Sequence, residues 1–574
     1  MSWLSQSGFT HESDYDLMNL QDGNPELNYV CIGSSNASFF PVESQWAMLG
    51  DCIGKDENIR TLIIGEASLV LVPRSSLLCF WKEVCKNKSI TELHLHCTDD
   101  YRKIKKSLWY QVTASEAVGD LLKKNSIRTL LLSGNANHQV YDPPRLKVGA
   151  AKEMARILES FSSLERLELR SYRLSCSDIS TIMQAFIPRH SCLEAICLYR
   201  VRLEGVEAWQ CLGHNVSKNA SLKKIEIHDT ISTSEDAVFL SEAICKYHQL
   251  ETLVLSNNSL ALSEGGQNRG IDYFGHRAIS LSVKTSLPNL QTLVLDDMSL
   301  SRVTLRLYSK ALKEKLSLKH LQISNHDNLR TLHEMDMIPF IPHKLCCNDW
   351  GYLFDTCFGD NYRLLSLDLE HSGIEDGTII LLAGKLQTNK TLKVLNLSGN
   401  GIITKKGWKA LLRLLWNPAS TGELYRSNHV LQTICGTTES SNADDYFYEL
   451  VEDHSGRKLV SQLRWVLMRN RETIPRMAAY IKMVYSFFRG YFDISSLLHV
   501  SANIGEHQNI NLVPDIVSWV GRGGLASVRK NRRVAYVSRL SFSVMYTLLR
   551  SNASVLLQFN GIKANTEHKK RRRK

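Results

Sequence analysis

The sequence has little proline and no long apolar run. Only 12 of its 574 residues are proline. Its most apolar stretch, residues 540–559, is interrupted by Arg550, Ser551 and Asn552, whereas a membrane-spanning helix needs roughly 20 largely apolar residues. Residues 1–24 are polar and acidic at their start and lack the apolar segment of a signal peptide. We therefore expect no membrane insertion and a flexible N-terminal segment.

The cysteines have no paired spacing. Fourteen are scattered along the chain without a C-x-x-C pair, and we interpret them as reduced thiols of an intracellular protein. Two groups contain residue types that bind metals: Glu92 with His94 and His96, and His343 with Cys346, Cys347 and Cys357. The first group has no assured further ligand and the second lacks a matching half, so we expect no metal and no other cofactor.

Motifs of catalysis are missing as well. The glycine-rich stretch at residues 521–524 is not followed by Gly-Lys-Ser/Thr and is therefore not a phosphate-binding loop. There is no Ser/His/Asp order and no paired-carboxylate motif that belongs to a recognisable fold. The sequence predicts a protein that is not an enzyme.

What the sequence does contain is a repeat, clearest at residues 391–402, TLKVLNLSGNGI. Its spacing is L-x-x-L-x-L-x-x-N-x-L. On a short strand Leu395 and Leu397 point into the core while Val394 points the other way. Asn400 follows where the chain bends, and its amide can satisfy backbone groups of that bend.

About thirteen copies of this pattern follow one another between residues 25 and 440. Copies that begin at residues 164, 193, 222 and 250 are 29, 29 and 28 residues apart. This period accommodates one strand and one helix, and helical apolar spacing occurs at residues 234–248, 377–389 and 406–416. Longer intervals indicate inserted loops, including residues 335–350, where Pro339 and Pro342 break the periodicity.

This alternation resembles the ribonuclease-inhibitor type of leucine-rich repeat protein, and the irregular copies resemble uncharacterised members of that family from unicellular algae. The resemblance implies an α/β fold, a horseshoe-shaped solenoid with a parallel sheet inside and helices outside. It also implies binding of a protein partner rather than catalysis.

The pattern stops after residue 440, and the charge changes there. From residue 445 onward, 22 Lys and Arg face 9 Asp and Glu, a net charge of +13; the whole chain carries +11, so the preceding part carries −2. Residues 441–562 are expected to form an α-helical domain that caps the last repeat, beginning with a helix over residues 446–469.

Residues 563–574 are expected to be a disordered basic tail. It ends in six consecutive cations, which repel one another and suit the acidic groove of an import receptor or the phosphates of nucleic acid. We favour nuclear import over a solubilising tail, and expect any nucleic-acid binding to be non-specific. The predicted location is cytoplasmic or nuclear. The six cations are Lys569, Lys570, Arg571, Arg572, Arg573 and Lys574.

Outward-facing positions of three middle repeats form the predicted binding surface. Arg and Tyr are frequent at interface hot spots because they combine buried area with polar groups. A solvated face with ion pairs inside the sheet is the alternative. The predicted partner-binding residues are Arg166, Glu168, Arg170, Tyr199, Lys224, Glu226 and His228.

We therefore expect a non-catalytic protein-interaction scaffold that binds its partner on the concave face or on edge loops. A GTPase-activating protein of the leucine-rich repeat type is one alternative, although the basic C-terminus departs from that family and no catalytic arginine can be assigned. A ubiquitin-ligase substrate receptor is another, although no F-box-like segment occurs in the first 60 residues.

Overall fold

The computed structural model describes residues 28–32, 43–65, 74–96, 127–134, 145–146, 150–159, 163–186, 192–231, 233–256, 258, 273–298, 300–313, 315–324, 345–360, 363–400, 403–435, 454–472 and 482. The chain divides into two compact units. The first comprises Met1–Lys385, Thr391–Thr404 and Ile434–Phe447, and the second comprises Leu386–Lys390, Lys405–Thr433 and Tyr448–Lys574.

One parallel sheet of thirteen strands follows the repeats in chain order. Strand pairing keeps the predicted core positions in line, since Leu167 lies beside Ile196 and Ile196 beside Ile225. The predicted strands and their register are thereby confirmed. The strands are β1 (Tyr29–Ile32), β2 (Thr61–Gly65), β3 (Glu92–His96), β4 (Thr129–Ser133), β5 (Arg166–Arg170), β7 (Ala195–Tyr199), β9 (Lys224–His228), β10 (Thr252–Ser256), β11 (Thr292–Asp296), β12 (His320–Ser324), β13 (Ser366–Asp368), β14 (Val394–Asn396) and β15 (Thr433–Cys435).

Helices alternate with these strands, and the three helices expected from apolar spacing correspond to α10, α15 and α16. Thr233 begins α10 with a capping box, in which its hydroxyl accepts from the backbone of Asp236. The first unit contains α2 (Glu43–Lys55), α4 (Arg74–Val84), α7 (Ala150–Glu159), α8 (Cys176–Phe186), α9 (Gly205–Val216), α10 (Ser234–Ile244), α11 (Tyr273–Ser286), α12 (Arg302–Leu312), α14 (Cys347–Asp355) and most of α15 (Asp376–Leu386).

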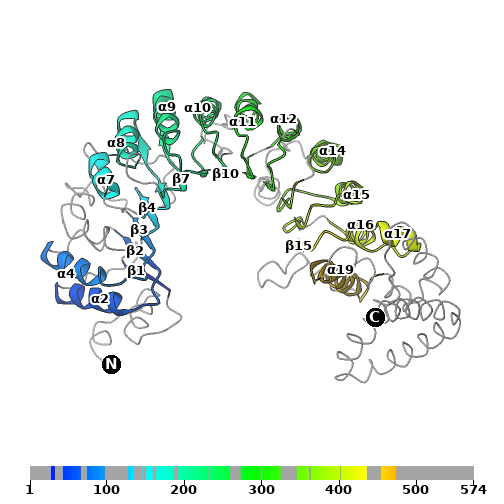
Figure 1. Ribbon diagram of the computed structural model, residues 1–574, viewed down its shortest axis with the longest axis horizontal. Helices are drawn as coiled ribbons and strands as arrows, with labels where there is room; N and C mark the ends of the chain where they lie inside the picture. Colours follow the sequence, from blue (N-terminus) through cyan, green and yellow to red (C-terminus); the bar gives the residue numbers. More distant parts are fainter. Residues whose placement is uncertain are drawn as a thin grey trace, which may run out of the picture. The chain divides into compact units, whose positions relative to one another are not determined.

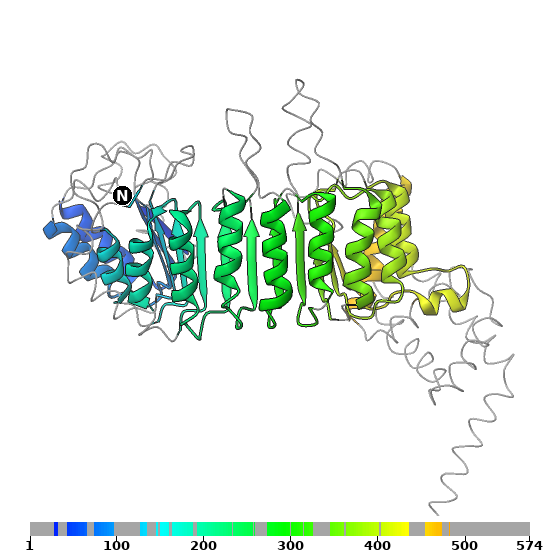
Figure 2. The same cartoon turned by 90° about the horizontal axis from the view of Figure 1, so that it is seen from above.

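In the first unit these helices form one layer and the strands the other (Figure 1). Figure 2 shows the strand arrows pointing the same way between the helices. Because neighbouring strands are about 4.8 Å apart and packed helices about 8–10 Å apart, the helix side is the wider one. We call the strand face that these helices leave uncovered the open face.

Alternation decides which side chains enter the core between the layers. Leu395 is fully buried, whereas Val394 beside it is half-buried on the open face. Asn400 is also buried: its amide donates to the carbonyls of Leu369 and Leu397 at 2.7 and 3.0 Å, and its oxygen accepts from the backbone of Ile374 at 2.9 Å. The predicted role of Asn400 in the bend is confirmed.

Six of the described repeats turn at an equivalent position, two residues after the last core residue of the strand motif. There the backbone is left-handed at Ser171, Arg200, Asp229, Asp297, His371 and Gly399, with φ between 47° and 69°. Backbone amides at these turns donate to the next strand, as Arg200 does to the carbonyl of His228 at 2.8 Å. Gly399 suits this conformation, while the other turns use residues with a side chain.

Several elements differ from the sequence-based expectations. The insertion expected over residues 335–350 is not a loop throughout, because α14 begins at Cys347 with Cys346 as its N-cap; residues 325–344 are outside the described part. A short parallel ladder of β6 (Arg173–Leu174) and β8 (Arg202–Leu203) was not predicted. A π-helical turn, η1 (Thr356–Asp360), also follows α14.

The second unit contains α16 (Lys405–Leu415), α17 (Thr421–Arg426) and α19 (His454–Glu472). The helix expected over residues 446–469 corresponds to α19, which runs on to Glu472, and its expected apolar residues Leu459, Leu463 and Val466 are buried. The Asn470 amide donates to the carbonyl of Leu431 at 2.6 Å. Apart from residue 482, the chain beyond α19, including the basic tail, lies outside the described residues.

Lys482 is buried in this second unit. Its ammonium group contacts the carbonyl of Leu415 at 2.8 Å, the carbonyl of Asn428 at 3.4 Å and the His429 ring at 3.0 Å. Burial lowers the pKa of Lys482 well below its ordinary value. Its nitrogen satisfies the carbonyl of Leu415, the last residue of α16, which has no intrahelical partner.

Candidate functional site

The predicted binding residues lie on three adjacent strands of the open face. Strand pairing places them in three rows: Arg166 with Ala195 and Lys224, Glu168 with Cys197 and Glu226, and Arg170 with Tyr199 and His228. We call the seven predicted residues of these rows the candidate patch. The structure therefore brings all seven together, since parallel pairing aligns equivalent positions of successive repeats.

Oppositely charged side chains of the candidate patch form a continuous chain of ion pairs. Its order is Lys224, Glu226, Arg166, Glu168 and Arg170. Lys224 contacts Glu226 at 2.5 Å and Arg170 contacts Glu168 at 2.5 Å; Arg166 pairs with Glu226 and lies 3.4 Å from Glu168. The chain of ion pairs begins and ends on a cation.

One of these contacts spans an intervening strand, and a small residue on that strand makes it possible. Arg166 on β5 reaches Glu226 on β9 across strand β7. The residue of β7 in the row of Arg166 is Ala195, whose side chain is one methyl group. The row of the two glutamates contains only Cys197 between them. Small side chains on β7 therefore leave room for the arginine to cross it.

The two glutamates are buried although they lie on the open face. Their side chains retain 9% and 8% exposure, against 29–39% for the cations around them. Sequence alternation predicted them as outward-facing, and the aliphatic stems of Arg and Lys can cover such groups. The glutamates thus hold the cations in place, and the exposed chemistry of the candidate patch is that of Arg170, Tyr199 and Lys224.

Electrostatics keeps this network charged. Burial alone raises the pKa of the Glu226 carboxyl, but hydrogen bonds from Arg166 and Lys224 lower it to about 2. Burial works against the charge of Arg166, yet its bond to Glu226 raises the pKa of the guanidinium above its ordinary value. Burial lowers the pKa of His228, whose ring is then neutral near pH 7.

Three residues of these rows also have metal-ligand types. One ligand atom each of Cys197, Glu226 and His228 lie within 4.8 Å of one another. The carboxylate is already paired with Arg166 and Lys224. Burial, together with Glu168 and Glu226, raises the pKa of the Cys197 thiol, which keeps it protonated, whereas metals bind the thiolate. Two adjacent cations and a protonated thiol oppose metal binding here.

An edge cluster adjoins the candidate patch where strands β7 and β9 end; it consists of Arg170, Tyr199, Arg200 and Asp229. The guanidinium carbons of Arg170 and Arg200 lie 5.1 and 5.7 Å from the centre of the Tyr199 ring. Nε of Arg200 donates to Asp229 at 2.6 Å. Sequence reasoning missed Arg200 and Asp229, because they lie in the turn beyond the strand positions that alternation identifies.

Other candidates from the sequence contribute less. On β3, burial lowers the pKa of His94, whose Nε2 lies 3.8 Å from Glu92; the side chain of His96 is outside the described residues. His343 is outside them as well, while Cys357 is buried and burial raises its pKa. Cys346 donates its thiol to Asp349 at 3.0 Å.

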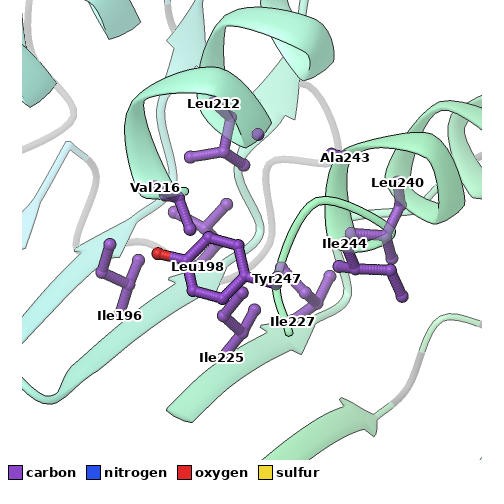
Figure 3. Close-up of a pocket in the computed structure, with 11 residues that line it drawn as sticks. Ile196, Leu198, Leu212, Val216, Ile225, Ile227, Leu240, Ala243, Ile244 and Tyr247 are labelled. Atoms are coloured by element: carbon purple, nitrogen blue, oxygen red, sulfur yellow. The ribbon is translucent and has the colours of Figure 1, made fainter. Parts of the chain in front are cut away.

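A cavity of about 20 Å³ lies under strands β7 and β9, enclosed by helices α9 and α10. Figure 3 shows the Tyr247 ring among aliphatic side chains of both layers. Its hydroxyl has no hydrogen-bond partner among the described residues, and burial raises its pKa. Gly213 allows close helix packing here, since a Cβ would lie 2.6 Å from Cα of Ala243. The cavity is a small gap in core packing.

The parallel strands, one per repeat, with a helix layer on one side define the fold as a leucine-rich repeat solenoid. Among solved structures, the chain is similar to the leucine-rich repeat-containing protein LegL7 from Legionella pneumophila, at 13% identity and a TM-score of 0.37, over 60% of this chain and 95% of that one. It is also similar to the TLR13 structure solved in complex with ssRNA13, at 14% identity and a TM-score of 0.28, over 62% of this chain and 52% of that one.

No family model matches the chain, and no curated protein matches it. Within the described residues, no helix is long and apolar enough to cross a membrane.

Proposed function

We propose that this protein is a non-catalytic interaction scaffold and that a protein partner binds the candidate patch. The repeat type that fits this proposal is the ribonuclease-inhibitor type, because its period of 28–29 residues holds a full helix in each repeat. The observation that carries the proposal is the ordered set of Arg170, Tyr199 and Lys224 on the open face, which none of the described helices covers.

Pre-ordering is what makes this surface suitable for binding. A long cation ordinarily loses side-chain freedom when a partner binds, at a cost of about 0.5–1.5 kcal/mol. In the candidate patch, buried Glu168 and Glu226 already fix Arg170 and Lys224. Part of that entropy is therefore lost on folding rather than on binding. The same carboxylates reduce the net charge, which limits unspecific attraction.

The test is a binding comparison with a matched control. The triple variant Arg170→Ala, Tyr199→Ala, Lys224→Ala is compared with Thr292→Ala, His320→Ala, Gln322→Ala, which truncates three side chains of the same open face on β11 and β12. Captured proteins are quantified by mass spectrometry. A partner retained by the control and lost by the triple variant supports the proposal, and equal capture by all proteins contradicts it.

Stability must be separated from binding in this test, because the triple variant breaks two ion pairs. Tyr199→Ala alone breaks no ion pair of the network, and its ring is only partly buried. Thermal denaturation of each variant identifies any that unfolds. Loss of the partner by folded Tyr199→Ala sustains the proposal even if the triple variant is unstable.

We also propose nuclear import through the basic residues 569–574. The support is compositional, since six consecutive cations suit an acidic import receptor. Deleting these six residues from a fluorescent fusion of the full chain is expected to lower the nuclear fraction. An unchanged distribution would contradict this proposal and leave the binding proposal intact.

A further inference from the structure

The edge cluster has a geometry that the rest of the open face does not share among the described residues. Two guanidinium groups, of Arg170 and Arg200, lie within 6 Å of one aromatic ring. Each donates through Nε to a carboxylate of the chain, to Glu168 and to Asp229 respectively. Tyr199 thereby forms an apolar base between two fixed cations.

The backbone at Arg200 is the second observation. Its φ of 52° lies in the left-handed region, where a side chain with Cβ is disfavoured. Equivalent turns use Gly399, Asp229, Asp297, Ser171 and His371; of these, glycine and aspartate adopt this conformation more readily than arginine. Arg200 donates its backbone amide to the carbonyl of His228, a bond that any residue other than proline could make there. The side chains of its ion pair with Asp229 are each about one-third exposed, and exposed ion pairs contribute little to stability.

An arginine in a left-handed turn that the other described repeats build with smaller side chains points to recognition as its role. The left-handed turn places the Arg200 guanidinium over the ring of Tyr199, which the Arg170 guanidinium also contacts. The charge of the surroundings then selects the ligand. The ion-paired residues of the candidate patch and the edge cluster carry a net charge of +1. They are the cations Lys224, Arg166, Arg170 and Arg200 and the anions Glu226, Glu168 and Asp229. His228 adds no charge near pH 7 while its pKa is lowered by burial.

We infer that the edge cluster binds a carboxylate side chain in an acidic segment of the partner protein. One carboxylate neutralises this net charge of +1, whereas a phosphate dianion would leave an excess negative charge. Guanidinium groups match the planar carboxylate with two parallel hydrogen bonds, and the Tyr199 ring supplies apolar contact for the neighbouring atoms of the segment. This inference rests on the proposed function and specifies its partner.

The test uses the full chain and a short labelled peptide of alternating Glu and Ser, with a peptide of alternating Gln and Ser as its neutral counterpart. Binding is followed by fluorescence polarisation. The Glu peptide is expected to bind and the Gln peptide not, and binding is expected to weaken with added salt. Arg200→Gly is expected to weaken binding about tenfold, the effect of losing one charge-assisted contact.

The matched control is Arg128→Ala. This arginine is exposed and paired with Glu165 at 3.5 Å, where strands β4 and β5 begin. It removes the same charge from the opposite edge of the sheet, so binding is expected to change by less than about twofold. Arg200→Gly is also expected to unfold at the same or a higher temperature than the parent, because glycine accepts the left-handed turn. Its loss of binding then cannot be attributed to unfolding.

Several outcomes would overturn the inference: equal binding of both peptides, full binding by Arg200→Gly, or a loss by Arg128→Ala as large as that by Arg200→Gly. A peptide with phosphoserine in place of Glu that binds more tightly than the Glu peptide would also overturn it. If these tests fail while Tyr199→Ala still loses a captured partner, the partner has another chemistry and the proposed function stands. If both fail, neither stands.

Discussion

Strands β5, β7 and β9 pair with one another in the same parallel register as β13 and β14 do. The side chains on their open face are different. The first group carries the alternating charges of the candidate patch. On β14 the corresponding residues are Val394 and Asn396. Beneath the sheet, both groups bury leucine and isoleucine at the same positions. The repeat motif therefore fixes the core layer and leaves the open face free to vary.

The turns of the two regions differ as well. The motif asparagine is present as Asn400, whereas equivalent positions of the middle repeats are Tyr172, Val201 and Thr230. Thr230 takes over part of the role, since its hydroxyl accepts from the backbone of Val201 at 3.2 Å. Asn258 of the following repeat accepts from the backbone of Thr230 at 3.0 Å. In both regions the turn is thus satisfied partly from the following repeat, and the region with the weaker motif carries the proposed binding surface.

Truncation of a core leucine is expected to have the largest effect on stability, and the effect should be similar in the middle repeats and in the repeat of β14. Leu395→Ala and Leu198→Ala should each lower the free energy of unfolding by roughly 2–5 kcal/mol, because both side chains are buried and leave a cavity. Val394→Ala should cost much less, since this side chain is half-buried. Chemical denaturation measures all three. Equal costs for Leu395→Ala and Val394→Ala would show that the assigned register is wrong.

The turn asparagine is expected to matter next. Asn400→Ala should cost roughly 1–3 kcal/mol, because it leaves buried carbonyls of Leu369 and Leu397 without a donor. Asn396→Ala, on the open face of the same repeat, serves as the control and should cost less than about 1 kcal/mol. Urea denaturation of both variants checks the difference. Indistinguishable midpoints would contradict the structural role of the buried amide.

Glu226 should make the stability of the middle region depend on acid. Its carboxyl has a pKa of about 2 in the folded protein and an ordinary value of 4.5. A lowered pKa means that its stabilisation is present above the ordinary value and is lost as the pH falls through 4.5 toward 2.

Glu226→Gln should therefore be less stable than the parent at pH 7, and the two should converge at acid pH. Thermal denaturation across this pH range measures the gap. Asp376→Asn in the other region is the control. A gap that stays constant with pH would contradict the charged pairing of Glu226 with Arg166 and Lys224.

The smallest effect is expected outside both regions. Lys55 and Asp51 form an exposed pair on α2 at 2.6 Å. Lys55→Ala should leave the free energy of unfolding nearly unchanged, because such pairs are solvated and screened by salt. Chemical denaturation of this variant gives a baseline for Glu226→Gln. If Lys55→Ala lost as much stability as Glu226→Gln, burial would not explain why the ion pairs of Glu226 are stabilising.

The sequence alone was enough to establish the repeat architecture. Its leucines recur with the alternation of a strand, and this local signal also identified the side chains of the open face, from Arg166 to His228. Helices α10 and α15 followed from their apolar spacing for the same reason. The additional elements β6, β8 and α17 are short, and so few residues carry no periodic signal.

Only the tertiary structure decided what these outward residues do together. Alternation assigns a direction to each side chain but no partner: it predicts that Glu168 and Glu226 face outward, and the structure adds that neighbouring cations bury them there. Parallel pairing brings residues 60 positions apart, Arg166 and Glu226, into contact across the small Ala195. The left-handed turn aims Arg200 at the Tyr199 ring. Contacts of this kind depend on the stacking of repeats, which no single repeat encodes.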